Sequence, residues 1–313
     1  MRQSYDFFSY LYSRIHFFIG LFHQTSKIMH KRPLLSFVFL LVMLTCYSQT
    51  MPILRVLAVG NSFSEDAVEQ YLYELAHEAG VNLIIGNGYR GGQSLASHWK
   101  DAKGTGSFQY RKIIDGNKTN RPATALRYMV TDEPWDIITF QQVSQESGLP
   151  DTYEPYLSML IGYVKALARV DTVRMGFHQT WAYAKDSDHF GFANYNRNQD
   201  YMYASITSTV EQTLRNHDEL TFCIPSGTAI QNARTSKILA SYEPARDFTR
   251  DGYHLDYKLG RYIAACTWLE AITGISPVGL SYRPEGITAE QAAAAQEAAH
   301  KALLVPTYVT PIK

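Results

Sequence analysis

The stretch Leu54-Arg55-Val56-Leu57-Ala58-Val59-Gly60-Asn61-Ser62-Phe63-Ser64 decides the fold. Its apolar, β-branched run predicts a buried strand, the Gly-Asn pair predicts a tight turn, and the pattern that follows predicts a helix beginning near Glu65. Ser62 would then lie at the carboxyl edge of the strand, close to a helix N-terminus. Its hydroxyl could act as a nucleophile or only cap the helix, and this stretch alone leaves both interpretations open.

Strands and helices continue to alternate along the rest of the chain. Apolar runs predict further strands at 81–86, 135–140, 173–177 and 220–224, and periodic apolar residues predict helices near 68–79, 156–167, 198–217, 262–273 and 288–304. Strand-helix-strand units favour parallel pairing, so these elements predict an α/β fold with a mainly parallel sheet of about five strands. We expect loops or a short hairpin within 95–134, and a long loop near the site at 183–198.

Polar or glycine-rich segments follow three of the predicted strands. Asn87-Gly88-Tyr89-Arg90-Gly91-Gly92-Gln93-Ser94 follows the second strand, Gln141-Gln142-Val143-Ser144 the third, and His178-Gln179-Thr180-Trp181 the fourth. The carboxyl ends of parallel strands meet at one edge of a sheet, and glycines there let backbone N–H groups approach a ligand closely. These segments are therefore candidates for the walls of a site beside Ser62.

A candidate base and its orienting carboxylate lie near the C-terminus, in Asp251-Gly252-Tyr253-His254. Hydrolysis by a serine requires a base to take the hydroxyl proton, a carboxylate to hold that base, and N–H donors for the developing oxyanion. Asp251 and His254 are three residues apart, so the carboxylate can reach the imidazole. The chain thus holds a candidate for every role.

With these pieces in place, the chain resembles the SGNH or GDSL-type serine hydrolases. Their first block resembles Gly60-Asn61-Ser62-Phe63-Ser64, their last block, Asp-x-x-His, resembles residues 251–254, and the order and separation of the blocks also match. The resemblance covers about residues 52–305. It implies a flavodoxin-like three-layer α/β/α sandwich.

The resemblance also implies roles for individual residues. Ser62 would be the nucleophile, His254 the general base and then acid, and Asp251 the residue that orients His254, while the helix-capping role passes to Ser64. Asn61 stands where Asp is commoner, which removes a charge beside the nucleophile without removing the reaction.

The oxyanion donors implied by the resemblance are the N–H groups of Ser62 and of a glycine in the second block. Gly92 fits that glycine by spacing, with Gly91 as the alternative. The third block departs from the family's Gly-x-Asn-Asp, because Gln141, Gln142 and Ser144 stand there. A glutamine amide can make the same N–H contact as asparagine, so we expect Gln142 to be the third donor, with Gln141 and Ser144 as rivals.

Other side chains suggest what the site binds or excludes. His178 and Trp181 are candidates to line the pocket and contact substrate, and a core or surface position is the alternative for His178. Cys223 and Cys266 lie in apolar runs and are predicted to be core residues rather than a disulfide or metal pair. No histidine and carboxylate pair has metal-ligand spacing, so neither a metal nor a cofactor is expected. Lys+Arg 29 balances Asp+Glu 29, which argues against a nucleic-acid partner.

The N-terminal residues predict export. Residues 29–48 have a basic start, a short apolar core and small residues, as secretory signal peptides do. We expect Met29 to be the true start, 1–48 to be an extension plus signal, and 49–313 to be one catalytic domain in the periplasm or outside the cell. Lipidation at Cys46 is the alternative, although its neighbours fit such a site poorly. The apolar core is too short to span a bilayer, so stable membrane insertion is not expected.

Together these features predict an exported serine esterase that removes a small acyl group, such as acetyl, from a carbohydrate. The 22 Tyr of the chain suit a surface that stacks against sugar-like ligands. A lipase or thioesterase of the same fold is one alternative. A non-catalytic glycan-binding protein is the other.

Overall fold

Seven strands form one sheet at the centre of the described part of the chain. The computed structural model describes residues 51–104, 107–240 and 247–313. The strands are β1 (Ile53–Gly60), β2 (Asn82–Tyr89), β3 (Phe108–Ile114), β4 (Asn117–Thr124), β5 (Ile137–Phe140), β6 (Arg174–His178) and β7 (Leu220–Ile224). Their order is β4-β3-β2-β1-β5-β6-β7. β1 pairs in parallel with β2 and β5, β5 with β6, and β6 with β7. The parallel strands alone therefore have the flavodoxin-like order 2-1-3-4-5.

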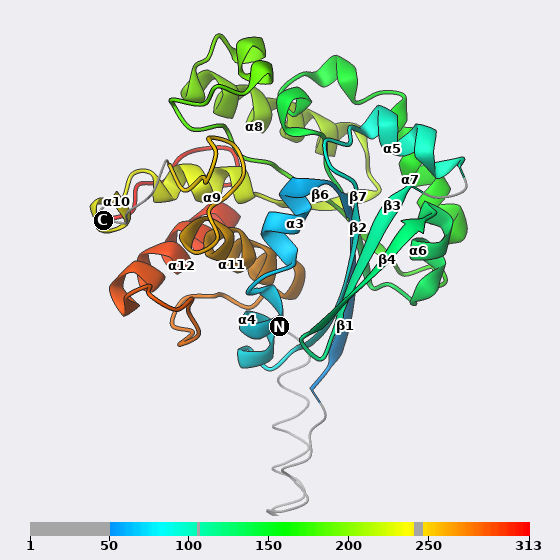
Figure 1. The fold of residues 1–313 in the computed structure, drawn as a ribbon, viewed down its shortest axis with the longest axis horizontal. Coiled ribbons are helices and arrows are strands. Elements are labelled where there is room, and N and C mark those ends of the chain that lie inside the picture. The colour runs from blue at the N-terminus through cyan, green and yellow to red at the C-terminus, as the bar shows by residue number, and fades with distance from the viewer. Residues whose placement is uncertain (1–50, 105–106, 241–246) are drawn as a thin grey trace, which may run out of the picture. The chain divides into compact units, whose positions relative to one another are not determined.

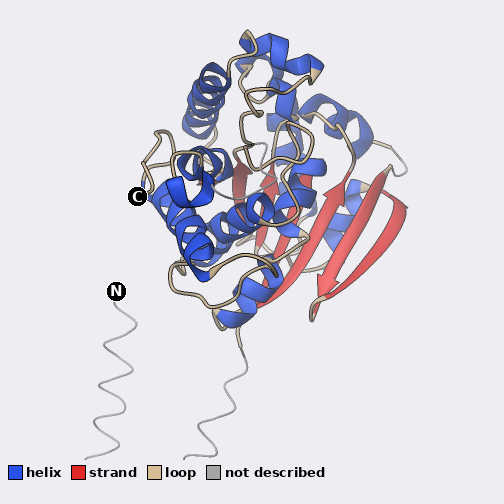
Figure 2. Cartoon of the chain, turned by 60° about the vertical axis from the view of Figure 1, so that its left-hand side comes forward, coloured by secondary structure: helices blue, strands red, loops and turns tan. Residues whose placement is uncertain are grey.

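Helices cover both faces of this sheet (Figures 1 and 2). They are α3 (Ser62–Val68), α4 (Leu72–Glu78), α5 (Leu95–Ala102), α6 (Leu126–Asp132), α7 (Tyr156–Leu167), α8 (Gln199–Asn216), α9 (Ser226–Ala233), α10 (Lys237–Ala240), α11 (Leu259–Thr273) and α12 (Ala289–Leu304), with the 3₁₀ turns η1 (Ser144–Glu146), η2 (Pro150–Thr152) and η3 (Phe190–Tyr195). In Figure 1, α3, α4, α9, α11 and α12 lie on one side of the sheet, and α5, α6 and α7 on the other. The predicted three-layer α/β/α sandwich is confirmed.

The central strands are buried, as their apolar sequences predict. All four residues of β5 and the last five of β1 are buried, because helices on both faces shield the middle of a parallel sheet from water. Cys266 is buried in α11, Cys223 is half-buried in β7, and both are free thiols. The prediction that these cysteines are core residues is confirmed.

The sheet has two more strands than the five expected, because residues 108–124 form a hairpin, one of the two alternatives expected within 95–134. β3 pairs antiparallel with β2 and with β4. The two residues between β3 and β4, Asp115 and Gly116, have φ values of 50° and 73°, as a two-residue type I′ turn requires. β4 is polar and exposed except at Thr124, which protects a sheet edge from pairing with other chains. A strand of that composition carries no apolar run for sequence analysis to detect.

The first helix differs from the prediction in its start and its continuity. It begins at Ser62 rather than near Glu65, and the single helix expected up to about residue 79 is broken between α3 and α4 at Tyr71, whose φ is 71°. The helix α12 begins at a capping box, in which Thr288 and Gln291 cap each other's backbone N–H.

No helix among the described residues is both long enough and apolar enough to span a bilayer. The predicted signal peptide, the start at Met29 and the lipidation alternative at Cys46 lie outside the described residues.

Candidate active site

The structure brings Ser62, His254 and Asp251 together at the carboxyl end of β1. His254 Nε2 lies 2.8 Å from Ser62 Oγ, and His254 Nδ1 lies 2.6 Å from Asp251 Oδ2. Ser62 follows β1 after one residue, Asn61, at the point in the sheet where the strand order reverses between β1 and β5. Open α/β sheets form their ligand sites at this position. A hydrogen-bonded Ser-His-Asp chain therefore lies where a substrate could reach it.

The contacts of Asp251 fix the protonation of this chain. Asp251 Oδ1 accepts the backbone N–H groups of Tyr253 and His254 at 3.1 and 2.8 Å, and Oδ2 faces His254 Nδ1. Partial burial raises the pKa of Asp251, but hydrogen bonds from the side chain and backbone of His254 outweigh it and hold that pKa below its usual value. An ionised Asp251 keeps the proton of His254 on Nδ1, so Nε2 is free to accept the Ser62 hydroxyl proton.

Asn61 holds the turn before Ser62 in place through three contacts. Its Oδ1 accepts the N–H of Phe63 at 2.9 Å, which makes Asn61 the helix N-cap. The same oxygen accepts Nε2 of Gln141 at 2.7 Å, and Asn61 Nδ2 donates to Gln93 O at 3.0 Å. The prediction that Ser64 caps this helix is wrong: Ser64 Oγ lies 2.8 Å from the carbonyl of Asn61, inside the first turn.

The glycine loop after β2 lies against the same turn. Arg90 N donates to Gly60 O at 3.3 Å, and Gln93 is held by Asn61 as described. Gly92, between these two anchors, is exposed and has a φ of 66°, a conformation that favours glycine. Gly60 is required for a different reason. A Cβ atom there would lie 2.5 Å from Ser64 Oγ.

The third block plays a structural part in place of the donor role predicted for it. Gln142 is buried, its Nε2 donates to O and Oγ1 of Thr152, and its Oε1 accepts the N–H groups of Leu95 and Val143. The Gln142 amide therefore has no N–H left for an oxyanion, which corrects the prediction. The rivals are engaged too, since Gln141 donates to Asn61, and Ser144 Oγ lies 2.7 Å from the Tyr183 hydroxyl.

His178 and Trp181, predicted to contact substrate, are both buried. Trp181 stacks on Phe63 with ring centroids 4.2 Å apart, and its Nε1 donates to Tyr253 O at 2.7 Å. It therefore supports both the residue after Ser62 and the residue before His254. The prediction that Trp181 contacts substrate is thereby corrected. The physical reason is that a large aromatic ring at a strand end can be buried against the residues that carry a site as well as line the site itself.

His178 belongs to a buried chain of hydrogen bonds that reaches the turn before Ser62. Gln141 must direct Nε2 at the acceptor Asn61 Oδ1, so its Oε1 faces His178 Nδ1, 3.1 Å away. His178 therefore carries its proton on Nδ1 and accepts from Ser226 Oγ at 3.0 Å through Nε2. Burial lowers the pKa of His178 to about 3, so the ring stays neutral at pH 7.

A second buried histidine allows the pH dependence of stability to be predicted. Burial also lowers the pKa of His98 to about 3, and this ring stacks on Phe108 with no hydrogen-bond partner among the described residues. Below pH 6.5 the unfolded chain binds protons that buried His98 and His178 do not. The free energy of unfolding should therefore fall as the pH drops, by about 1.4 kcal/mol per pH unit for each histidine.

The variant His98→Phe tests this pH dependence, since it removes one titrating ring and no hydrogen bond. Urea unfolding between pH 5.5 and 4 should show a pH slope smaller than that of the wild type by about 1.4 kcal/mol per unit. Equal slopes in the two proteins would show that His98 is protonated in the folded state.

Asp66 is a residue of the site that the motifs did not reveal. Its side chain is 0% exposed and accepts Arg250 Nη1 at 3.0 Å and the backbone N–H of Leu255 at 2.9 Å, while Arg261 Nη2 lies 2.6 Å away. Desolvation raises the pKa of Asp66, and the two arginines oppose that rise. Asp66 thus ties the segment that carries His254 to the helix that carries Ser62. A carboxylate on the buried face of a helix is the sequence signal that could have found it.

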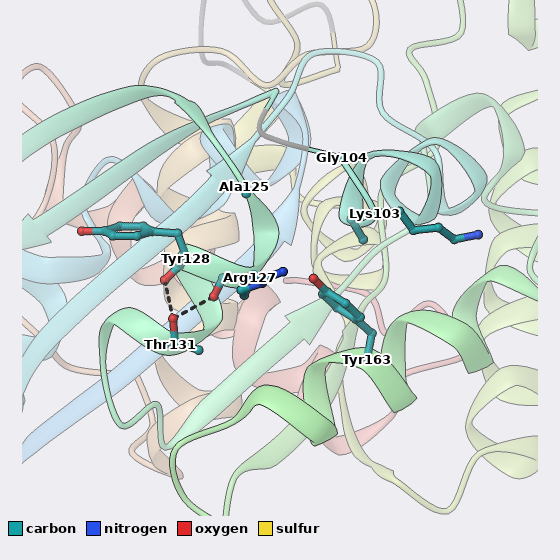
Figure 3. A pocket seen from close by; sticks show the side chains of 8 residues that line it. Lys103, Gly104, Ala125, Arg127, Tyr128, Thr131 and Tyr163 are labelled. Atoms are coloured by element: carbon teal, nitrogen blue, oxygen red, sulfur yellow. Dashed lines mark hydrogen bonds between the residues drawn. The ribbon is translucent and has the colours of Figure 1, made fainter.

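A cavity of about 610 Å³ lies away from the triad, at the end of α5 and the start of α6 (Figure 3). In Figure 3, Arg127 and Tyr163 face one another across it, and the Lys103 ammonium group points outward. The described residues of its lining include no histidine and no carboxylate: Ala102, Lys103, Gly104, Ala125, Arg127, Tyr128, Thr131 and Tyr163. These residues offer no base for ester hydrolysis. Among the described residues, no group of three or more His, Cys, Asp or Glu is placed to hold a metal ion.

Comparisons with known proteins agree with this fold. Residues 55–302 match the family described as "Domain of unknown function (DUF4886)". The crystal structure of a DUF4886 family protein from Bacteroides uniformis is 44% identical, with a TM-score of 0.79 over 83% of this chain and 100% of that chain. No curated protein matches the sequence significantly.

Two esterase structures are remotely similar. An acetylxylan esterase from Geobacillus stearothermophilus is 12% identical, with a TM-score of 0.43 over 72% of this chain and 97% of that chain. A family 3 carbohydrate esterase from Clostridium thermocellum is also 12% identical, with a TM-score of 0.39 over 70% of this chain and 94% of that chain.

Proposed function

This chain belongs to the DUF4886 family, and from the geometry of its site we propose that it is an exported serine esterase that removes a small acyl group, such as acetyl, from a carbohydrate. The observation that carries the proposal is the continuous hydrogen-bond chain from Ser62 Oγ through His254 to Asp251. Its two distances lie within the range for a nucleophile and its base, and for that base and its orienting carboxylate.

Acylation forms one bond and breaks another. Ser62 Oγ attacks the ester carbonyl carbon while its proton passes to His254 Nε2, and the resulting imidazolium is stabilised by Asp251. When the tetrahedral intermediate collapses, the bond to the sugar oxygen breaks and His254 gives its proton to that oxygen. The sugar leaves as an alcohol, and the acyl group remains on Ser62.

Deacylation repeats these steps with water. His254 Nε2 takes a proton from water as the water oxygen attacks the acyl carbon. The bond between the acyl carbon and Ser62 Oγ then breaks, and Ser62 Oγ takes the proton back from His254. Two backbone groups are proposed as oxyanion donors. The N–H of Ser62 belongs to the first helical turn, where N–H groups have no intrahelical acceptor, and the N–H of Gly92 lies in the loop anchored to Gly60 and Asn61.

The substrate class is supported by less direct observations than the reaction. The predicted export signal and the abundance of tyrosine favour an extracellular carbohydrate ester. A lipase or thioesterase would use the same triad on a longer acyl chain. A glycan-binding protein would use the fold and no reaction at all.

A panel of esters tests the proposal. The purified protein should hydrolyse p-nitrophenyl acetate, should release acetate from at least one acetylated polysaccharide, and should be much slower on p-nitrophenyl palmitate. A preference for the palmitate ester would favour the lipase. Failure to hydrolyse any of the three would contradict the proposed function.

A further inference from the structure

Four rings in consecutive contact lead from the triad histidine to the surface. The Tyr253 and His254 rings are tilted by 40°, the His189 and Tyr253 rings meet edge to face at 62°, and the His189 and Phe190 rings are stacked. The Tyr253 ring lies 4.2 Å from His254 between centroids, the His189 ring 4.5 Å from Tyr253, and the Phe190 ring 4.6 Å from His189 at an interplanar angle of 24°. Phe190 is 74% exposed. A large apolar side chain is thus exposed to solvent at the end of a row of ring contacts that begins at the catalytic histidine.

The segment that carries His189 and Phe190 is held in place by Gln145, the residue after the third block. His189 Nδ1 accepts the N–H of Gly191 at 3.1 Å, and a Cβ atom at Gly191 would lie 2.2 Å from Gln145 Cβ. The backbone carbonyl of Gln145 accepts Asn194 Nδ2 at 3.0 Å and the Tyr195 hydroxyl at 3.2 Å. The segment that carries Phe190 is therefore packed closely against the turn after β5 and is fixed relative to the triad.

The imidazole of His189 adds polar nitrogen atoms to this row of rings. Burial is the largest cause of its lowered pKa, and nearby His254 adds to it, so the ring is neutral at pH 7. Because Nδ1 accepts the Gly191 N–H, the proton of the neutral ring is on Nε2. These rings thus combine aromatic surface with a hydrogen-bond donor.

We propose that Phe190, His189 and Tyr253, here called the aromatic shelf, bind the sugar ring that carries the ester. This inference rests on the proposed esterase function and names the side of the substrate that the protein recognises. A sugar ring has an apolar C–H face that packs on an aromatic ring and hydroxyl groups that accept hydrogen bonds, so it matches both properties of the shelf. An acyl chain matches it poorly, since Lys185 and Asp188 in the same segment are exposed and charged.

The variant Phe190→Ala tests the shelf. Phe190 is exposed, so its removal should leave folding unchanged. The value of kcat/KM for p-nitrophenyl acetate, which has no sugar ring, should fall far less than the value for an acetylated oligosaccharide. On an acetylated oligosaccharide that the wild type deacetylates, KM should rise about 10-fold with kcat nearly constant, because binding shared by the ground and transition states is lost. Phe190→Trp should restore the wild-type KM.

The matched control is Tyr308→Ala, which removes another aromatic side chain, 72% exposed, near the C-terminus, and should leave both activities unchanged. An unchanged KM for the oligosaccharide in Phe190→Ala would overturn the shelf, and so would a loss confined to long-chain p-nitrophenyl esters. Failure of the wild type to hydrolyse p-nitrophenyl acetate would instead contradict the esterase function itself.

Discussion

Replacing Ser62 by alanine should lower kcat for p-nitrophenyl acetate by at least about 10⁴-fold, the scale observed when a triad nucleophile is lost. The variant lacks the oxygen that attacks the carbonyl, and no other hydroxyl is recorded within hydrogen-bond distance of His254 Nε2 among the described residues. Ser62 is only partly buried, so the free energy of unfolding should change by less than about 1 kcal/mol. Initial rates and urea unfolding measure the two effects.

Ser64→Ala is the matched control for this variant, because Ser64 lies in the same motif. Its hydroxyl contacts Asn61 O and Asn87 Oδ1, so its loss should cost about 1 kcal/mol of stability while activity stays within about 10-fold of wild type. The reverse pattern, with Ser62→Ala active and Ser64→Ala inactive, would assign the nucleophile to Ser64.

Replacing Asp66 by asparagine should give the largest loss of stability, about 3–5 kcal/mol, because it leaves charged Arg250 and Arg261 without their shared carboxylate. The NH₂ group of an asparagine amide would also face N–H donors of the two arginines or of Leu255, with which it cannot form a hydrogen bond. Activity should fall as well, since Asp66 accepts the N–H of Leu255, the residue after His254. Urea unfolding at pH 7 measures the stability, and the ester assay measures the activity.

An exposed ion pair provides the control for Asp66. Glu211 and Arg215 pair on the surface of α8 with half or more of each side chain exposed, and such pairs contribute about 0.3–0.5 kcal/mol. Glu211→Gln should therefore change the stability by no more than that amount. A similarly small change in Asp66→Asn would show that the buried cluster does not hold the two segments together.

The fold was predictable because its decisive elements are apolar and local. The run before Gly60 predicts a buried strand by composition alone, and β7 has the bounds that its apolar run predicts. The hairpin was less predictable because β4 is a polar edge strand stabilised by its pairing with β3. The helix α9, which was missed, is rich in small and polar residues that are buried only by tertiary packing.

Within the site, two short motifs and their order along the chain identified Ser62, Asp251 and His254, which the structure brings together. Side-chain amides are less predictable, because the same group can face a ligand or the protein's own backbone. Gln142 illustrates this, since its four contacts depend on η2, α5 and its neighbour Val143. Trp181 and His178 likewise lie at a strand end. Only the contact of Trp181 with Phe63 and that of His178 with Gln141 reveal that these side chains are buried and support the residues of the site.

Covalent labelling tests the central claim, that His254 activates Ser62 as the nucleophile, most directly. The protein would be treated with a fluorophosphonate, digested and examined by mass spectrometry. We expect one adduct, on Ser62, with labelling strongly slowed in His254→Ala because the hydroxyl then lacks its base. An adduct on another residue, or no adduct on a protein that hydrolyses p-nitrophenyl acetate, would contradict the account.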